Sequence, residues 1–118
     1  MPNRKDIATL LDIQRASQKV IQFQQGISKT DFMEDDKTQS AIVFQLMIVG
    51  EAVKRLSQEF RTLHPEIPWQ LIAGMRDKLI HHYDDIDWAE VWKTATTDIP
   101  VLLSQINPLI PQPPHSEG

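Results

Sequence analysis

The feature that most constrains the fold is a series of apolar residues in the middle of the chain, spaced alternately by four and three positions. The series consists of Ile42, Leu46, Val49, Val53, Leu56, Phe60 and Leu63. This spacing is typical of the buried stripe of an α-helix that packs against other helices. We therefore expect one long helix over residues 42–63. Asp35 and Asp36 precede it, and we interpret them as a solvated helix start, because negative charge is favoured there.

Two further segments with helical periodicity lie on either side of this helix. Residues 10–27 carry an apolar residue at every third or fourth position, and Gly26 near their end is a typical stop signal. A polar loop is expected over residues 28–36. Pro68 is well placed as the first residue of a third helix, which continues over residues 69–80.

The C-terminal part of the chain predicts a fourth helix and then a tail. Asp87 is a good N-cap for this helix, and Pro100 should kink it or split it after Asp98. The fold class is thus all-α, an antiparallel bundle of four to five helices. We expect one helical domain over residues 1–107 and a proline-rich, disordered tail over residues 108–118.

Charge and composition exclude several classes of protein. The chain has 118 residues, enough for one domain, and a net charge of −4, which argues against a protein whose main role is to hold nucleic acid. It has no cysteine, and its N-terminus lacks the pattern of a signal peptide. Its longest apolar stretch, residues 41–50, is shorter than the about 20 residues that cross a bilayer. We expect a cytoplasmic protein without a membrane segment.

The apolar face of the long helix is wider than one small bundle can cover. Beside the main stripe it includes Val43, Phe44, Met47 and Ile48. A chain of this length buries a thin core and exposes few large apolar patches as a monomer. We interpret the extra surface as a homodimer contact.

Reactive side chains concentrate in residues 75–85, which include Arg76, two adjacent histidines and the only tyrosine of the chain. Histidine exchanges protons near neutral pH, and arginine matches phosphate geometry. Together they could cleave a phosphodiester bond without a metal. The alternative is structural, because Lys78, His81 and His82 also suit the negative end of a helix.

Helix geometry restricts the catalytic interpretation. In an unbroken helix, Arg76 and His81 point roughly 140° apart. They converge only if the helix ends before His81, if the arginine side chain wraps round, or if two subunits contribute.

A metal site is a further alternative. Imidazole and carboxylate ligands suit several divalent metals. The candidates are His81, His82, Asp84, Asp85 and Asp87. Adjacent histidines point in different directions and no second cluster completes the shell, so we expect neither a metal nor a cofactor.

These residues match a known motif. Arg76-x4-His81-x-Tyr83 is the extended form, ending H-x-Y, of the R-x4-6-H motif of HEPN domains. Four other stretches agree in the expected order: Phe32-Met33-x-Asp35-x-x-Thr38-x-x-Ala41, Val49-Gly50-Glu51-Ala52-Val53-Lys54, Pro65-Glu66-Ile67-Pro68-Trp69 and Ala73-Gly74-Met75-Arg76-Asp77. From about Asp6 to Pro108 the chain resembles the HepT-like toxin family of the HEPN superfamily.

The resemblance implies a homodimeric ribonuclease toxin of a type II/VII-like toxin–antitoxin pair, with a composite site at the dimer interface. It makes Arg76 and His81 the catalytic pair, Asp77 their polar companion and Glu51 a supporting residue. It makes Tyr83 the tyrosine that an MntA-type minimal nucleotidyltransferase antitoxin modifies with AMP. The implied substrate is RNA, with tRNA a plausible target, and assembly beyond the dimer is open.

Two other functions remain open. Many relatives have Phe-Gly after H-x-Y, whereas this chain has Asp84-Asp85, which adds negative charge where phosphate would approach. That charge favours a non-catalytic partner, which would serve a nucleotidyltransferase as regulatory subunit and AMP acceptor. The third alternative is a structural helical oligomer.

Overall fold

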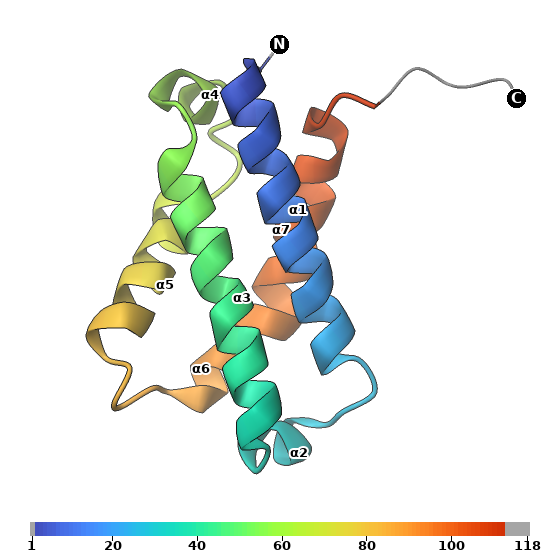
Figure 1. The fold of residues 1–118 in the computed structure, drawn as a ribbon, viewed down its shortest axis with the longest axis vertical. Coiled ribbons are helices and arrows are strands. Elements are labelled where there is room, and N and C mark those ends of the chain that lie inside the picture. Colours follow the sequence, from blue (N-terminus) through green and yellow to red (C-terminus); the bar gives the residue numbers. More distant parts are fainter. Residues whose placement is uncertain (1, 113–118) are drawn as a thin grey trace, which may run out of the picture.

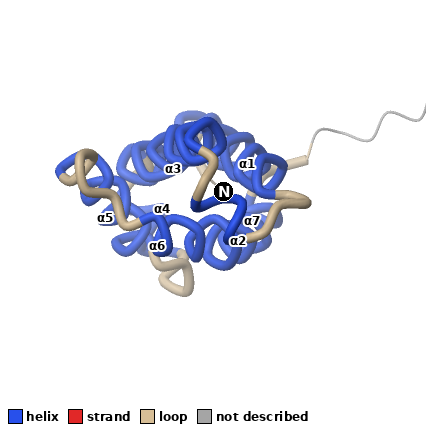
Figure 2. The backbone as a smooth tube through the Cα atoms, turned by 90° about the horizontal axis from the view of Figure 1, so that it is seen from below, coloured by secondary structure: helices blue, strands red, loops and turns tan. Residues whose placement is uncertain are grey.

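Two long antiparallel helices, α1 and α3, form one side of the molecule, and α6 and α7 lie on the other (Figures 1 and 2). The computed structural model describes residues 2–112, and this part of the chain contains helices and no strands, so the predicted all-α bundle is confirmed. Its elements are α1 (Arg4–Gln24), α2 (Lys29–Met33), α3 (Asp36–Arg55), α4 (Gln58–Leu63), α5 (Trp69–His81), α6 (Trp88–Lys93), the π-helical η1 (Thr94–Asp98), α7 (Ile99–Ile106) and the 3₁₀-helical η2 (Asn107–Leu109).

The core is formed by the apolar stripes that the periodicity indicates. Fully buried side chains include Leu10, Ile13 and Val20 of α1 and Ile42, Leu46, Val49 and Val53 of α3. These stripes face one another, since α1 and α3 make the most extensive contact between any two helices of the described chain. Burial of such side chains contributes about 1.5–3 kcal/mol each.

The prediction of one helix over residues 42–63 is wrong in its last third. α3 ends at Arg55, Leu56 is extended, and Ser57 caps the separate helix α4. The break is fixed by the buried carboxylate of Asp6, which accepts hydrogen bonds from the Ser57 backbone N–H at 2.9 Å and from its hydroxyl at 2.6 Å. Leu63, expected in the buried stripe, is 64% exposed.

A short helix, α2, lies where we predicted a loop. Ser28 and Asp31 form a reciprocal capping box that starts it. Phe32 is fully buried and packs against the rings of Trp88 and Trp92. α2 thereby joins the α1–α3 side of the bundle to α6.

The predicted helix starts are largely confirmed. Asp35 caps α3, accepting hydrogen bonds from the hydroxyl and the backbone N–H of Thr38, and these bonds lower the pKa of its carboxyl. Asp87 caps α6, with Glu90 N 3.1 Å from its carboxylate. The third helix starts at Trp69, one residue later than we placed it, so that Pro68 precedes it.

The interruption that we expected at Pro100 is a π-helical turn, and the chain stays helical through it rather than splitting. After α6 the backbone widens over Thr94–Asp98, and the Ile99 N–H donates to the Thr94 carbonyl five residues back. α7 then starts at Ile99, directly after Asp98, with Pro100 in its first turn.

The end of the chain is packed further than the expected tail suggests. Asn107–Leu109 form η2, and Ile110 is buried. Residues 113–118 of that tail lie outside the described residues, and the domain boundary at 107 stays a prediction. Across the described residues, no helix is long and apolar enough to cross a membrane.

Candidate functional site

The site is built where α5 crosses α3, its main packing partner in the described chain. Gly50 of α3 is buried against Arg76 of α5. A Cβ atom at position 50 would collide with the Cβ of Arg76 and lie 2.9 Å from its Cγ. Only glycine therefore allows the stem of Arg76 to lie this close to the α3 backbone.

The guanidinium of Arg76 is held by two carboxylates. Its Nη2 lies 2.9 Å from Oε2 of Glu51, and its Nη1 lies 3.0 Å from Oδ1 of Asp77. The same Asp77 oxygen accepts a hydrogen bond from Nζ of Lys54 at 2.9 Å. We name these four residues, Glu51, Lys54, Arg76 and Asp77, the α3–α5 charge cluster.

Charge is balanced within the α3–α5 charge cluster, and all four side chains reach solvent. Arg76 is the least exposed, at 25%, whereas the side chains of the other three are 40–46% exposed. The hydrogen bond from Lys54 and then that from Arg76 hold the pKa of the Asp77 carboxyl below its ordinary value. Asp77 is consequently ionised at neutral pH.

His81 and Tyr83 lie apart from this cluster. α5 includes His81, so a helix that ends before His81 is excluded as the way in which Arg76 and His81 meet. Both His81 and Tyr83 are exposed, Tyr83 by 77%. Within residues 2–112 no hydrogen bond or ion pair joins either of them to Arg76. The structure thus brings together Arg76, Asp77 and Glu51, and leaves His81 and Tyr83 open to solvent.

The residues of the metal alternative do not form one group. His82, Asp85 and Asp87 line a cavity of about 300 Å³ beneath the end of α5, while His81 and Asp84 are exposed outside it. No set of three or more histidine, aspartate or glutamate residues in the described part of the chain is placed to hold a metal ion.

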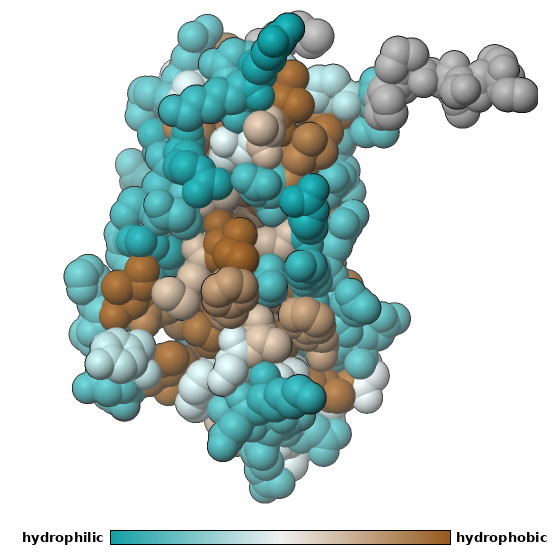
Figure 3. Space-filling view, in the orientation of Figure 1, coloured by the Kyte–Doolittle hydropathy of each residue, from teal (hydrophilic) through white to brown (hydrophobic). Residues whose placement is uncertain are grey.

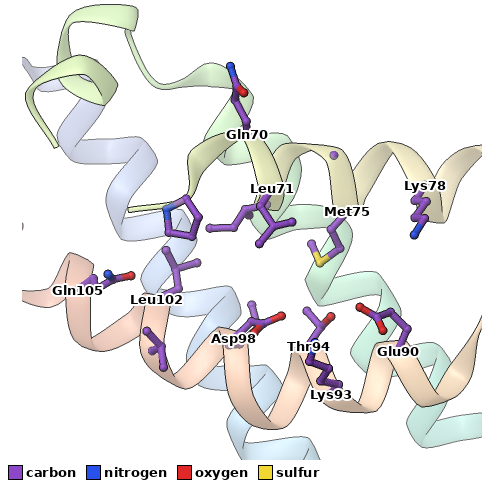
Figure 4. Close-up of a pocket in the computed structure, with 15 residues that line it drawn as sticks. Gln70, Leu71, Met75, Lys78, Glu90, Lys93, Thr94, Asp98, Leu102 and Gln105 are labelled. Atoms are coloured by element: carbon purple, nitrogen blue, oxygen red, sulfur yellow. The ribbon is translucent and has the colours of Figure 1, made fainter. Parts of the chain in front are cut away.

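A larger groove of about 620 Å³ separates α5 from the α6–α7 segment (Figure 4). Leu71, Met75 and Lys78 point into it from α5, toward Thr94 and Leu102. Arg76 is not among its lining residues, so the groove borders a different face of α5. The sequence analysis missed this groove, since its walls come from segments far apart in the chain.

Lys54 is the other feature that the sequence analysis missed. It belongs to a stretch that matched the family, but nothing in its spacing relates it to Asp77, which is 23 residues away. The signal that could have revealed it is its spacing from Glu51. Lys54 lies one helical turn after Glu51 on α3, so both side chains are on the face toward α5.

An all-α bundle with an Arg-x4-His-x-Tyr segment that runs from α5 into the exposed turn after it is typical of a HEPN-type domain. A family model described as Ribonuclease HepT-like matches residues 13–109. The chain therefore belongs to the HepT-like ribonuclease family, a family of RNA-cleaving enzymes.

Curated relatives agree with this assignment. The chain is 45% identical over 100 residues to "Probable ribonuclease HepT" of Thermococcus cleftensis, covering 85% of this chain and 91% of the relative. It is 46% identical over 85 residues to a "Putative RNase" of Caldanaerobacter subterraneus, covering 72% and 76%. It is 36% identical over 110 residues to a "Putative RNase" of Methanocaldococcus jannaschii, covering 93% and 91%. No significant match to a solved structure was found.

Proposed function

We propose that the protein is a metal-independent endoribonuclease toxin that acts in the cytoplasm as a homodimer. Arg76 and His81 of both protomers would line one cleft and cleave RNA there. The observation that carries the proposal is how Arg76 is positioned. Gly50 leaves room for its aliphatic chain, and Glu51 binds its guanidinium at a surface open to solvent.

The chemistry follows from the two side chains. A His81 imidazole takes the proton of a ribose 2′-hydroxyl, or gives one to the departing 5′-oxygen. The 2′-oxygen attacks phosphorus and the bond from phosphorus to the 5′-oxygen breaks, which leaves a 2′,3′-cyclic phosphate and a 5′-hydroxyl. Arg76 donates hydrogen bonds to the non-bridging oxygens, where negative charge develops.

The homodimer is supported by an apolar surface on α3. Phe44 is 61% exposed, and Val43, Met47 and Ile48 are half-buried beside it. Apolar side chains gather along the middle of the face that carries α3 (Figure 3). This surface continues along α3 toward Glu51, so a two-fold axis on it would bring both α3–α5 charge clusters to one interface. A second subunit would then supply the His81 that Arg76 lacks within its own protomer.

Cleavage of RNA in the presence of a chelator tests the assignment of roles. We expect His81→Ala to lower the rate about 100-fold or more, and Arg76→Ala to lower it about 100- to 1,000-fold. His82→Ala, the matched control from the adjacent position, should cleave at nearly the wild-type rate. Equal rates in the wild type, Arg76→Ala and His81→Ala would refute the catalytic roles. Parallel reactions with tRNA and with unstructured RNA identify the substrate class.

Silencing by adenylylation is the second part of the proposal. The exposed Tyr83 hydroxyl would attack the α-phosphorus of ATP in an MntA-type minimal nucleotidyltransferase, release pyrophosphate and lose its proton. The attached AMP would bring a bulky anion to the cleft and repel RNA. Mass spectrometry after co-expression should find AMP on the wild type and none on Tyr83→Phe. An unmodified wild type, with active nucleotidyltransferase present, would refute this part.

A non-catalytic role remains the second candidate. The net charge of −4, the exposed Asp84 and Asp85 and the balanced charge of the α3–α5 charge cluster favour it. It predicts that expression of the chain alone leaves growth unchanged, whereas the toxin predicts growth arrest that Arg76→Ala abolishes.

A further inference from the structure

Lys54 is a cation of the α3–α5 charge cluster for which neither the motif nor the relatives supply a role. It lies on α3 just beyond Glu51, and its ammonium donates to the Asp77 oxygen that also accepts from Arg76. The ammonium of Lys54 and the guanidinium of Arg76 therefore donate to the same carboxylate oxygen. The Lys54 side chain is 40% exposed, and an ammonium carries three donors, so solvent and substrate can reach it.

The charge of the cluster depends on Lys54. Glu51 and Asp77 carry two negative charges, whereas Arg76 carries one positive charge. Lys54 supplies the second positive charge, which makes the cluster neutral. Without Lys54 the cluster would carry a net negative charge, which repels a phosphate. An enzyme that places two carboxylates on its arginine thus needs a second cation before RNA can approach.

The contact between Lys54 and Asp77 is easily exchanged. Both side chains are about two-fifths exposed, and ion pairs at such exposure contribute little to stability. Arg76 is less exposed and bonded to two carboxylates, so it is the fixed member. Lys54 has a flexible side chain, so its ammonium can leave the Asp77 carboxylate and bind another anion instead.

We propose that Lys54 is a second phosphate-binding residue of the RNA site: its ammonium leaves Asp77 and contacts an RNA phosphate beside the one that Arg76 holds. This inference rests on the proposed ribonuclease function. The competing interpretation is structural, with Lys54 only tying α3 to α5 through Asp77. The two interpretations differ in how the effect of removing the Asp77 charge depends on Lys54.

The experiment measures binding of a single-stranded RNA oligonucleotide to the full-length protein over a series of salt concentrations. All variants carry His81→Ala, so that the RNA is not consumed. Lys54→Met should weaken binding several-fold and reduce the slope of log affinity against log salt by about 0.7, the value for one lost contact to single-stranded phosphate. Lys54→Arg should retain the slope. Lys19→Met, which removes an exposed lysine from α1, is the matched control and should change neither quantity.

Asp77→Asn, made with and without Lys54→Met, separates the two interpretations. Loss of the Asp77 carboxylate favours RNA binding in both backgrounds, because it removes a negative charge beside Arg76. If Lys54 binds phosphate, this loss also frees its ammonium, so Asp77→Asn tightens RNA binding more in the protein with Lys54 than in Lys54→Met. If Lys54 only ties the helices together, the gain in affinity with Lys54 present is equal or smaller, and the inference is overturned. It is also overturned if Lys54→Met binds as Lys19→Met does while the protein with His81 intact cleaves RNA. A wild type that neither cleaves nor binds RNA would instead refute the proposed function itself.

Discussion

Gly50 allows Arg76 to pack closely against α3, a role that its position in the sequence does not reveal. The motif predicted Arg76, Asp77 and Glu51 as site residues, and the structure brings these three together. Nothing in the sequence relates Gly50 to Arg76, since their contact arises only when α5 packs on α3. Spacing along a chain reports which residues share a helix face, but not which residue of another helix they meet.

Replacement of Gly50 by alanine should disturb the arginine directly. The added Cβ collides with Cβ of Arg76, and overpacking of this kind costs about 1–3 kcal/mol of unfolding free energy. RNA cleavage should fall as well, because Arg76 is displaced from Glu51. Gly74→Ala is the control: nothing lies within 4 Å of its Cβ position, so it should stabilise helix α5 by about 0.5–1 kcal/mol. Urea unfolding measures both changes, and a Gly50→Ala protein as stable and active as wild type would contradict the packing argument.

At the scale of helices, signals within a few residues predicted several helix ends. The end of α3 depends on a distant contact and was not predicted. Asp35 and Asp87 act within a few residues of themselves, and the structure confirms both as helix caps. Near Pro100 the helix is interrupted only by a π-helical turn. The break at Ser57 depends on Asp6, 51 residues away. Apolar spacing continues through Leu56 and Phe60, both of which are buried, so periodicity alone carries no sign of the break.

Asp6→Ala should destabilise the bundle more than other changes on α1. It removes the acceptor of two part-buried hydrogen bonds from Ser57, at a cost of about 1–3 kcal/mol. Asp12→Ala, on the same helix, loses only exposed ion pairs with Arg15 and Arg55 and should cost below about 1 kcal/mol. Equal losses for the two variants in thermal unfolding would argue against Asp6 as the fixed point.

For the whole molecule, the wide apolar face of α3 remains the strongest indication of a partner copy. The sequence predicted it from the excess of apolar residues, and the structure leaves Phe44 largely exposed. The mutual placement of Arg76 and His81 could not be predicted, since it involves a second chain if the site is composite.

Phe44→Glu should separate the proposed dimer into monomers, because two carboxylates would meet in an apolar contact. We expect light scattering coupled to size-exclusion chromatography to report the monomer mass, together with loss of RNA cleavage. Leu63→Glu introduces the same charge at a similarly exposed leucine of α4 and should remain dimeric and active. A dimeric Phe44→Glu protein would place the interface elsewhere.

The groove beside α5 has a consequence for how the enzyme responds to heat. α5 has one extensive neighbour, α3, and open space along another face, whereas α1 packs on both α3 and α7. Regions with sparse packing open at lower free energy than the core around them. Amide exchange should therefore be faster in α5 than in α1. Catalysis should cease at temperatures where circular dichroism still records a largely intact set of helices.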